Sequence, residues 1–515
     1  MIESWQNKTQ KNSMAIIGRK KEIKEFNELY NSGKAELVAV YGRRRVGKTF
    51  LIDETLAGKL TFRHAGLSPI EYEQSKGKDE EKKPRVNLMK LQLKQFYVSL
   101  QQYGMRKSHQ PASWIDAFLM LSQLMEQKDK GQRIVIFLDE LPWMDTPRSK
   151  FVTAFEGFWN NWACHRHNVM VVVCGSATSW IQDKLIDNHG GLYGRVTREI
   201  KLSPFTLREC EQFYRSRGVR MSRYDIVQSY MVMGGIPYYM NYMRSGLSLG
   251  QMVDEMFFCA KPRLQNEYDR LFASVFSRPE DMKRIVEAMY KRHAGWTRQQ
   301  LLEMTGMESN ETFTKMLKAL TASDFVVKYV PFGMKKTEVH YKLVDPFCWF
   351  WLHFVKGQTR LVTDFWKGEP SQAVVSWRGI AFEEVCWYHW PQIKRSLGIE
   401  GVQTELSAWV RRQNDPSTSL RNHNDDDNMG GTQVDLLLIR DDHVVNMCEM
   451  KFYNDEFSVS KAYHKILVQR QNLLERELPS HTVVHSTLVT TEGLKYNEYS
   501  SDFQQVITLE ELFES

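Results

Sequence analysis

Residues 42–49, GRRRVGKT, have the residue types and spacing of a loop that wraps around phosphate groups. In the pattern GxxxxGK[ST], two glycines let the backbone curl so that its N–H groups point at an anion. Lys48 can then reach the β- and γ-phosphates of a nucleoside triphosphate, and the Thr49 hydroxyl is placed to bind Mg²⁺. We therefore expect ATP and Mg²⁺ as ligands. The residues expected to contact them are Gly42, Arg43, Arg44, Arg45, Val46, Gly47, Lys48 and Thr49.

Two adjacent acids follow a second apolar run, RIVIFLDE, which ends at Asp139 and Glu140. A carboxylate at the carboxyl end of a buried strand is where a magnesium-binding acid belongs beside such a loop. Asp139 is therefore expected to bind Mg²⁺ together with Thr49. Glu140 is placed to polarise an attacking water, which makes Glu140 and Lys48 the expected catalytic residues. Two neighbouring acids favour hydrolysis over passive binding.

A third apolar run, NVMVVVCG, is followed by two hydroxyl side chains. Ser176 is the first candidate to sense the γ-phosphate, and Thr178 is the second. The alternative is that these hydroxyls only cap the turn that follows the strand.

The first half of the chain alternates short apolar runs with longer amphipathic segments. We expect strands at about 35–42, 59–66, 133–140 and 168–175, with helices between them. The last two runs are almost continuously apolar, as strands covered on both faces must be. This pattern predicts an α/β fold with a parallel sheet. The polar segment 69–86 is expected to form a surface loop.

From about residue 202 the pattern becomes helical, and from about 281 it changes again. Three predicted helices precede two strands that a Gly- and Lys-containing turn joins, which is the order of a winged helix. Thr297 is the expected N-cap of the second helix. The predicted helices are 281–293, 297–306 and 309–323, and the hairpin lies within 325–345. The predicted domains are an ATP-binding α/β core at 1–201, a helical segment at 202–280, a winged helix with linker at 281–360 and a C-terminal domain at 361–515.

The third of these helices is the expected recognition helix if this module binds DNA. A DNA-binding helix presents several basic side chains to phosphates and polar side chains to base edges. The alternative is an intramolecular module that relays the state of the ATPase. The polar and basic side chains available are Asn310, Thr312, Thr314, Lys315 and Lys318.

The C-terminal part contains VDLLLIRDDHVVNMCEMKFY, in which acids stand on two consecutive predicted strands. Alternate residues of a strand share a face, so Glu449 and Lys451 are expected to point the same way. Asp435 and Glu449 could hold Mg²⁺, and Lys451 could orient water or stabilise developing charge. The alternative is a surface salt bridge. The loop 411–431, with Asp425, Asp426 and Asp427, is expected to be mobile instead of a metal site.

Several segments together resemble the archaeal-type ATPase family, which is related to STAND and AAA+ ATPases. They are IIGRKKEI, LYGRVTREIKLSPF, GGIPYYM and YKLVDPFCWFWLHFV. The resemblance implies that Pro237, in Gly235-Ile236-Pro237, senses nucleotide from the helical lid. It also places Arg195 where the family could carry an arginine that reaches phosphate, with a structural salt bridge as the alternative.

The C-terminal part resembles the PD-(D/E)xK nuclease fold, whose core runs helix, three strands, helix, strand. Glu383, in GIAFEE, matches the metal-binding acid that the first helix of that fold contributes. Val434 departs from the pattern, because many members carry Pro there. The implied fold is a P-loop parallel sheet with a helical lid, then a winged helix, then an α/β restriction-endonuclease-like domain.

Composition sets limits on the partners. Lys and Arg total 69 against 62 Asp and Glu, and the resulting charge of +7 permits nucleic-acid contact without requiring it. The seven cysteines show no zinc spacing. The polar N-terminus and the absence of long apolar runs predict a cytoplasmic protein with no membrane segment.

Two hypotheses from different classes follow. The first is a Mg²⁺-dependent ATPase whose nucleotide state controls the winged-helix arm and the nuclease-like domain. The second is an ATP-gated switch that binds DNA or a protein partner and carries a catalytically inactive C-terminal domain. A purely structural tail, for example one that mediates homo-oligomer formation, is a third alternative.

Overall fold

The computed structural model describes residues 16–68, 87–187, 190–358, 365–366, 371–411 and 432–514. The loop expected at 69–86, and most of the loop expected at 411–431, lie outside these residues. The chain divides into two compact units: unit 1 holds Met1–Pro204 and Asp269–Pro279, and unit 2 holds Phe205–Tyr268 and Glu280–Ser515. Within the part described, no helix has both the length and the apolar character needed to cross a membrane.

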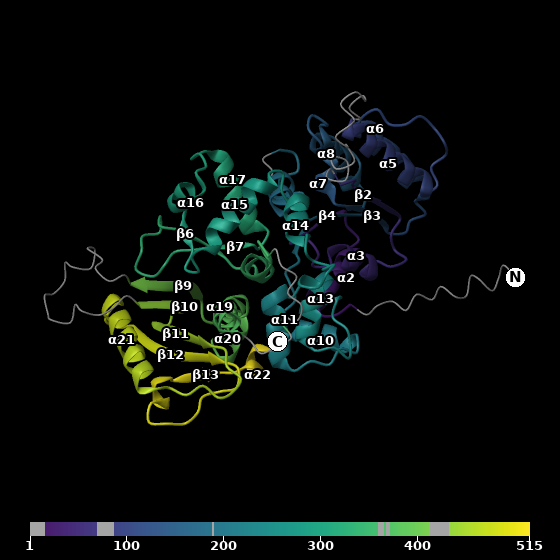
Figure 1. Ribbon diagram of the computed structural model, residues 1–515. Coiled ribbons are helices and arrows are strands. Elements are labelled where there is room, and N and C mark those ends of the chain that lie inside the picture. Colours follow the sequence, from purple (N-terminus) through teal and green to yellow (C-terminus); the bar gives the residue numbers. More distant parts are fainter. Residues whose placement is uncertain are drawn as a thin grey trace. The chain divides into compact units, whose positions relative to one another are not determined.

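Unit 1 is built on a five-stranded parallel sheet in the order β2-β3-β4-β1-β5 (Figure 1). The strands β1, β3 and β4 are buried at every position, which explains why their sequences are apolar throughout. The α/β fold with a parallel sheet that the sequence predicted is thereby confirmed. The strands are β1 (Glu36–Tyr41), β2 (Phe62–Ala65), β3 (Ile134–Asp139), β4 (Val169–Gly175) and β5 (Arg198–Lys201).

Helices pack their aromatic side chains against this sheet. Phe96, Trp114, Phe118 and Phe151, from three helices, are all buried, and each is in ring contact with at least two of the others. The helical elements are α2 (Lys20–Asn31), α3 (Lys48–Thr55), α5 (Leu88–Gln102), α6 (Trp114–Lys128), α7 (Leu141–Met144), α8 (Phe151–Asn161), η1 (Ala163–His165), α9 (Thr178–Ile181) and η2 (Gln182–Ile186).

Unit 2 begins with helices that follow the sheet of unit 1 in the sequence. At the end of the second helix the chain turns at Gly235, which has a φ of +64°. A Cβ atom there would lie 2.4 Å from the carbonyl oxygen of Phe205, so only glycine fits this turn. The helices are α10 (Leu207–Ser216), α11 (Arg223–Met233), α12 (Pro237–Met240), α13 (Leu249–Phe257) and α14 (Glu267–Val275), most of which belongs to unit 1.

We predict that Gly235→Ala destabilises the chain more than Gly218→Ala, a matched control with a φ of +68° and open space around its Cβ position. The control meets only the left-handed backbone cost of about 1–2 kcal/mol. Gly235→Ala adds an overpacking cost of about 1–3 kcal/mol. Thermal unfolding of the two variants measures the difference, and equal losses would show that the contact with Phe205 is unimportant.

The middle of unit 2 contains three helices and a small antiparallel sheet in the order β6-β8-β7 (Figure 1). Thr297 caps the second helix, because its side chain accepts a hydrogen bond from the Gln300 N–H. The elements are α15 (Pro279–Tyr290), β6 (Trp296–Thr297), α16 (Arg298–Thr305), α17 (Glu311–Ala322), β7 (Val326–Tyr329) and β8 (His340–Leu343). A buried aromatic segment follows as α18 (Pro346–Phe350) and η3 (Trp351–Val355).

The C-terminal part of unit 2 holds a mixed sheet in the order β13-β12-β11-β10-β9. Neighbours among β9, β10 and β11 are antiparallel, and neighbours among β11, β12 and β13 are parallel. The register between β9 and β10 shifts between Val434 and Leu437. The elements are α19 (Gln372–Tyr388), α20 (Trp390–Ser396), β9 (Thr404–Arg411), β10 (Thr432–Arg440), β11 (Val444–Lys451), α21 (Lys461–Glu477), β12 (Val483–Thr490), η4 (Ser500–Asp502), β13 (Gln505–Ile507) and α22 (Leu509–Leu512).

Candidate functional site

The strand order of unit 1 brings the predicted nucleotide-binding residues to one edge of the sheet. Strand β4 lies between β1 and β3, and all three are parallel, so their carboxyl ends share that edge. Gly42 follows β1, Ser176 follows β4 and Glu140 follows β3. This edge of an open parallel sheet is where α/β folds bind ligands.

The loop after β1 curls as the glycine spacing predicts. Gly42 has a φ of +140°, and a Cβ atom there would lie 2.2 Å from the carbonyl oxygen of Leu202. Gly47 precedes α3, and Lys48 and Thr49 are the first residues of that helix. The free N–H groups and the dipole of a helix N-terminus favour an anion at this position.

Lys48 is the centre of a buried hydrogen-bond network. Its Nζ atom donates to the carbonyl oxygens of Gly42 and Arg43, each at 2.9 Å, and to Ser176 Oγ at 3.1 Å. Ser176 Oγ donates in turn to Glu140 Oε1 at 2.7 Å, and the Ser176 N–H donates to Glu140 Oε2 at 3.0 Å. Lys48, Ser176 and Glu140 therefore form one connected chain of polar groups.

Thr49 and Asp139 form the second pair of this edge. Thr49 Oγ1 donates to Asp139 Oδ2 at 3.0 Å, and Arg63 lies 3.8 Å from the same oxygen. Burial, and then the neighbouring Glu140 carboxylate, raise the pKa of Asp139. A divalent cation would relieve the repulsion between the buried Asp139 carboxylate and the half-buried Glu140 carboxylate, and hydroxyl and carboxylate oxygens suit Mg²⁺. The residues present therefore fit a magnesium ion.

Glu140 has a strained backbone, with a φ of +45°. A non-glycine residue in this left-handed region costs roughly 1–3 kcal/mol and is found most often at functional sites. Hydrogen bonds from the Ser176 N–H and Oγ hold the carboxylate in place at the end of β3. Position and strain together fit a residue that acts on a ligand at this edge.

The remaining predicted residues of this site have different surroundings. Thr178 is fully buried, and its hydroxyl has no hydrogen-bond partner among the described residues, so Ser176 is the better placed of the two hydroxyl candidates. The Arg44 guanidinium lies 5.6 Å from the ring centroid of Trp143. Arg195 is exposed, and Pro237 is the first residue of α12 in unit 2. Arg43 and Val46 are buried, and Arg45 has a φ of +73°.

Comparison with known proteins shows what the part of the chain that contains this edge is similar to. Residues 16–243 match a family described as an ATPase domain predominantly from Archaea. This stretch is similar to the ATPase domains of that family. The match includes all the predicted residues of the ATP site, from Gly42 to Pro237, and it supports ATP binding and hydrolysis by the domain.

Two relatives and one solved structure are similar to parts of this chain. An uncharacterized protein of Methanocaldococcus jannaschii is 21% identical over 417 residues, which cover 80% of this chain and 85% of that protein. An uncharacterized ATP-binding protein of the same organism is 46% identical over 44 residues, which cover 8% of this chain and 75% of that protein. Among solved structures, the Walker-type ATPase of Pyrococcus abyssi has a TM-score of 0.44 and 18% identity, covering 65% of this chain and 96% of that one.

Outside the ATPase domain, the structure brings two of the predicted C-terminal acids together with a histidine. His293 Nδ1 lies 3.4 Å from Glu383 Oε2 and 3.6 Å from Asp435 Oδ1. His293 Nε2 lies 2.5 Å from Glu384 Oε1, and Lys342 Nζ lies 2.9 Å from the same oxygen. His293, Glu383 and Asp435 thus meet from three different segments of the chain, and a cation could bind between them.

The charges of this cluster perturb one another strongly. Burial, followed by the Asp435 carboxylate, raises the pKa of Glu383 to about 8. Burial and the Lys342 ammonium lower the pKa of His293, but Glu384 and Asp435 outweigh them and raise it to about 9. Burial raises the pKa of Asp435, but contact with His293 outweighs it and lowers the pKa to about 2. The carboxylates of this cluster therefore favour a positive charge at the position of His293.

Glu449 and Lys451, the other two predicted residues, have a different set of neighbours. Arg470 and Tyr463, both on α21, donate hydrogen bonds to the Glu449 carboxylate, the tyrosine at 2.5 Å. Lys451 Nζ lies 3.8 Å from Glu449 Oε2 and 4.8 Å from the Tyr463 ring centroid. Asp435 lies within the register shift of β10, which explains how it turns to His293 while Glu449 faces α21.

Sequence reasoning did not find His293, Lys342, Glu384 or Arg470. His293 lies in the turn after α15, Lys342 on β8 and Arg470 in the middle of α21. No sequence spacing relates these three residues to the predicted acids, because only tertiary contacts bring them close to those carboxylates. The one available signal was the second acid of GIAFEE, Glu384, which stands next to the predicted Glu383.

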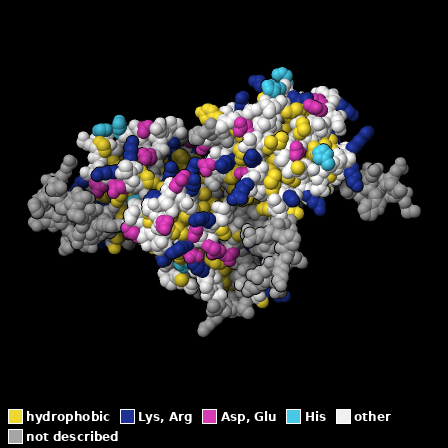
Figure 2. Space-filling view, turned by 90° about the horizontal axis from the view of Figure 1, so that it is seen from above, with side chains coloured by type: hydrophobic (Ala, Val, Ile, Leu, Met, Phe, Trp, Pro, Cys, Tyr) yellow, Lys and Arg dark blue, Asp and Glu magenta, His cyan; other side chains and the backbone are white. Residues whose placement is uncertain are grey.

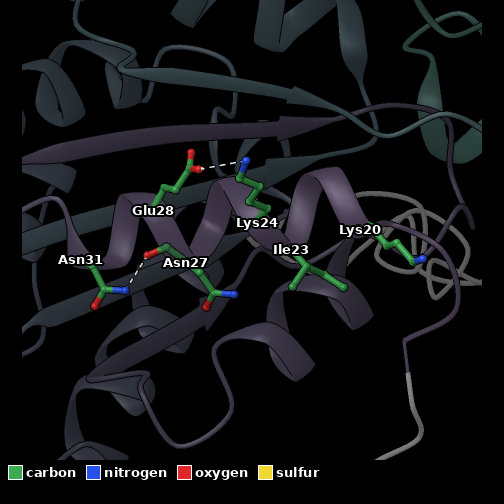
Figure 3. Close-up of a pocket in the computed structure, with 6 residues that line it drawn as sticks. All are labelled: Lys20, Ile23, Lys24, Asn27, Glu28 and Asn31. Carbon is green, nitrogen blue, oxygen red and sulfur yellow. Dashed lines mark hydrogen bonds and ion pairs between the residues drawn. The ribbon is translucent and has the colours of Figure 1, made fainter.

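A surface pocket lies along α2, and all its lining residues belong to that one helix (Figure 3). Some of its polar groups are paired: Lys24 lies 3.8 Å from Glu28, and the Asn31 amide donates to the carbonyl oxygen of Asn27 at 2.8 Å. None of the predicted site residues lines it. The pocket therefore has no part in the candidate sites.

Proposed function

We propose that the chain is a Mg²⁺-dependent ATPase whose nucleotide state controls the winged-helix arm and the nuclease-like C-terminal domain. The observation that carries the ATPase part is the connected network of Lys48, Ser176 and Glu140 beside the Thr49–Asp139 pair. It offers a cation for phosphate, a hydroxyl that can follow the γ-phosphate and a carboxylate for water within one buried edge.

Each residue then has a definite task in hydrolysis. Lys48 leaves the loop carbonyls and contacts the β- and γ-phosphates of ATP, and Glu140 orients the attacking water. Ser176 contacts both Lys48 and Glu140. Its hydroxyl can therefore give up these hydrogen bonds and form one to the γ-phosphate instead. When bound at Thr49 and Asp139, Mg²⁺ supplies charge stabilisation for the phosphoryl group that is transferred.

Contacts inside unit 2 support the control of its C-terminal part. The Leu207 N–H, at the start of α10, donates to His389 Nε2 at 3.0 Å. Burial lowers the pKa of His389 to about 4, so the ring is neutral and can accept this bond. The Trp366 N–H donates to Asp254 Oδ1 at 2.8 Å. A movement of α10–α13 in response to nucleotide would therefore be transmitted to the C-terminal part.

A specific observation favours the second candidate, an ATP-gated switch with an inactive C-terminal domain. The Glu449 carboxylate is buried and already receives hydrogen bonds from Arg470 and Tyr463. These two hydrogen bonds use part of the acceptor capacity of the carboxylate and hold it against α21, which leaves less of it for a metal ion. A domain that binds DNA or a protein without cleaving nucleic acid has no need of a metal ion at Glu449.

The case for DNA contact by the predicted recognition helix rests on few charges. On α17, Lys315 pairs with Glu311 at 2.8 Å, which reduces the positive charge available to phosphates. Over the face shown in Figure 2, basic and acidic side chains of the described residues are interspersed. A partner that binds to the face shown in Figure 2 would meet both positive and negative side chains.

The experiment that tests the proposed function is incubation of supercoiled and linear DNA with the protein, ATP and Mg²⁺ or Mn²⁺. We predict ATP-dependent cleavage that Lys451→Ala abolishes and that Lys461→Ala, an exposed lysine at the start of α21, leaves intact. Salt-sensitive DNA binding without cleavage would support the switch instead. Cleavage that Lys451→Ala leaves unchanged would contradict the assigned nuclease site.

A further inference from the structure

We propose that His293, Glu383 and Asp435 form a binding site for a transition-metal ion of the Zn²⁺ class, with an imidazole ligand from the turn after α15. This site is distinct from the Mg²⁺ site of the ATPase. It shares two acids with the proposed nuclease-like site, but its third ligand is His293 in place of Glu449.

The ligand atoms have the separations that a small ion requires. Two atoms that each lie about 2.1 Å from a tetrahedral ion are about 3.4 Å apart. His293 Nδ1 lies 3.4 Å from Glu383 Oε2 and 3.6 Å from Asp435 Oδ1. All three ligand atoms lie within 4.8 Å of one another. The geometry can therefore accept an ion with only small side-chain adjustments.

The second ring nitrogen of His293 has the partner that a metal-bound histidine needs. Nε2 lies 2.5 Å from Glu384 Oε1, which can hold the proton on that nitrogen and leave the lone pair of Nδ1 for a metal. Metal-ligating histidines nearly always have such a carboxylate or carbonyl on the far side of the ring. Glu384 is 2% exposed and is itself held by Lys342 at 2.9 Å.

The charge of the deprotonated cluster also suits a divalent cation. Metal binding requires a neutral imidazole and ionised carboxylates. In that state Glu383, Glu384 and Asp435 face one ammonium, that of Lys342, and the remaining two negative charges match those of a divalent ion. Buried charges of one sign are costly unless they are paired or bind a metal. One nitrogen and two carboxylate oxygens suit Zn²⁺ or a similar transition ion better than Mg²⁺, which prefers oxygen ligands alone.

Three protein ligands leave the fourth position of a tetrahedral ion open to water, as in catalytic zinc sites. The ion would also connect the segment after α15 to α19 and β10, which are far apart in the sequence.

The inference rests on the proposed function only because both proposals use the carboxylates of Asp435 and Glu383. Its readout is metal affinity, so its failure is distinguishable from a failure of ATP hydrolysis or DNA cleavage.

The test is titration of the full chain with Zn²⁺ alone, without nucleotide, in competition with a chromophoric chelator. We expect His293→Gln to weaken Zn²⁺ binding at the tightest site by at least about 10-fold. Removing a residue that only supports a metal ligand typically lowers metal affinity about 10–100-fold, so loss of a ligand should have at least the smaller of these effects. His464→Gln is the matched control, because His464 contacts a single carboxylate, Asp502, at 2.7 Å. It should leave the affinity unchanged.

A measurement on the unmodified chain keeps the proposal testable if a variant does not fold. X-ray absorption of the Zn²⁺-loaded protein should show imidazole and oxygen ligands at about 2.0–2.2 Å and no sulfur. Sulfur ligands, or an absence of imidazole, would overturn the proposal. Equal Zn²⁺ affinities of the wild type and a folded His293→Gln variant would also overturn it.

Discussion

Lys48→Ala is expected to reduce the rate of ATP hydrolysis by at least about 10²–10³-fold. Loss of a single group that stabilises developing charge in a buried site typically has an effect of that size. Lys48 also contributes to ground-state binding, because its Nζ atom is the positive charge that meets the phosphates. The Kd for ATP should therefore rise as well. Phosphate release and equilibrium binding of ATP measure the two effects separately.

The control for this prediction is Lys34→Ala, which removes an exposed lysine two residues before β1. It should leave both quantities unchanged. Lys48 also donates to Gly42, Arg43 and Ser176, so circular dichroism of the variant is needed to show that the loop keeps its fold. If a folded Lys48→Ala protein binds and hydrolyses ATP as the wild type does, residues 42–49 are not the nucleotide site.

Glu140→Gln is expected to lower kcat by about 10²–10⁴-fold, the usual contribution of a general base, while the Kd for ATP changes little. The substitution keeps the shape of the side chain, and its carbonyl oxygen can still accept the Ser176 N–H. It removes the negative charge that polarises water. Single-turnover hydrolysis with saturating ATP separates this loss of rate from any loss of binding.

The control here is Glu126→Gln, an acid on α6 that pairs with Arg166. It should hydrolyse ATP at the wild-type rate. A Glu140→Gln protein that retains full activity would remove Glu140 from the mechanism and leave Asp139 as the acid to examine next.

Much of the ATPase domain could be predicted from the sequence because its determinants are local. The apolar run before Gly42 and the run that ends at Asp139 both form buried strands at the expected positions. The short edge strand β5 was not predicted, because Ile200 is its one buried residue and four residues give no periodicity. Pattern is most informative over longer buried runs and least informative in a short, mostly exposed edge strand.

The C-terminal cluster illustrates what sequence reasoning does not reach. Alternation along a strand correctly related Glu449 to Lys451, but it gave no sign of the register shift at Asp435. The partners of these acids, Arg470 and His293, come from a distant helix and a distant turn. Such contacts depend on tertiary packing, and no spacing in the chain encodes them.

The central claim is that the edge formed by Lys48, Ser176, Glu140 and Asp139 binds ATP and hydrolyses it. The most direct test is to incubate wild type and Glu140→Gln with ATP and Mg²⁺, remove free nucleotide and identify what each protein retains. We predict ADP on the wild type and intact ATP on the variant. ADP on both proteins, or nucleotide on neither, would contradict this account.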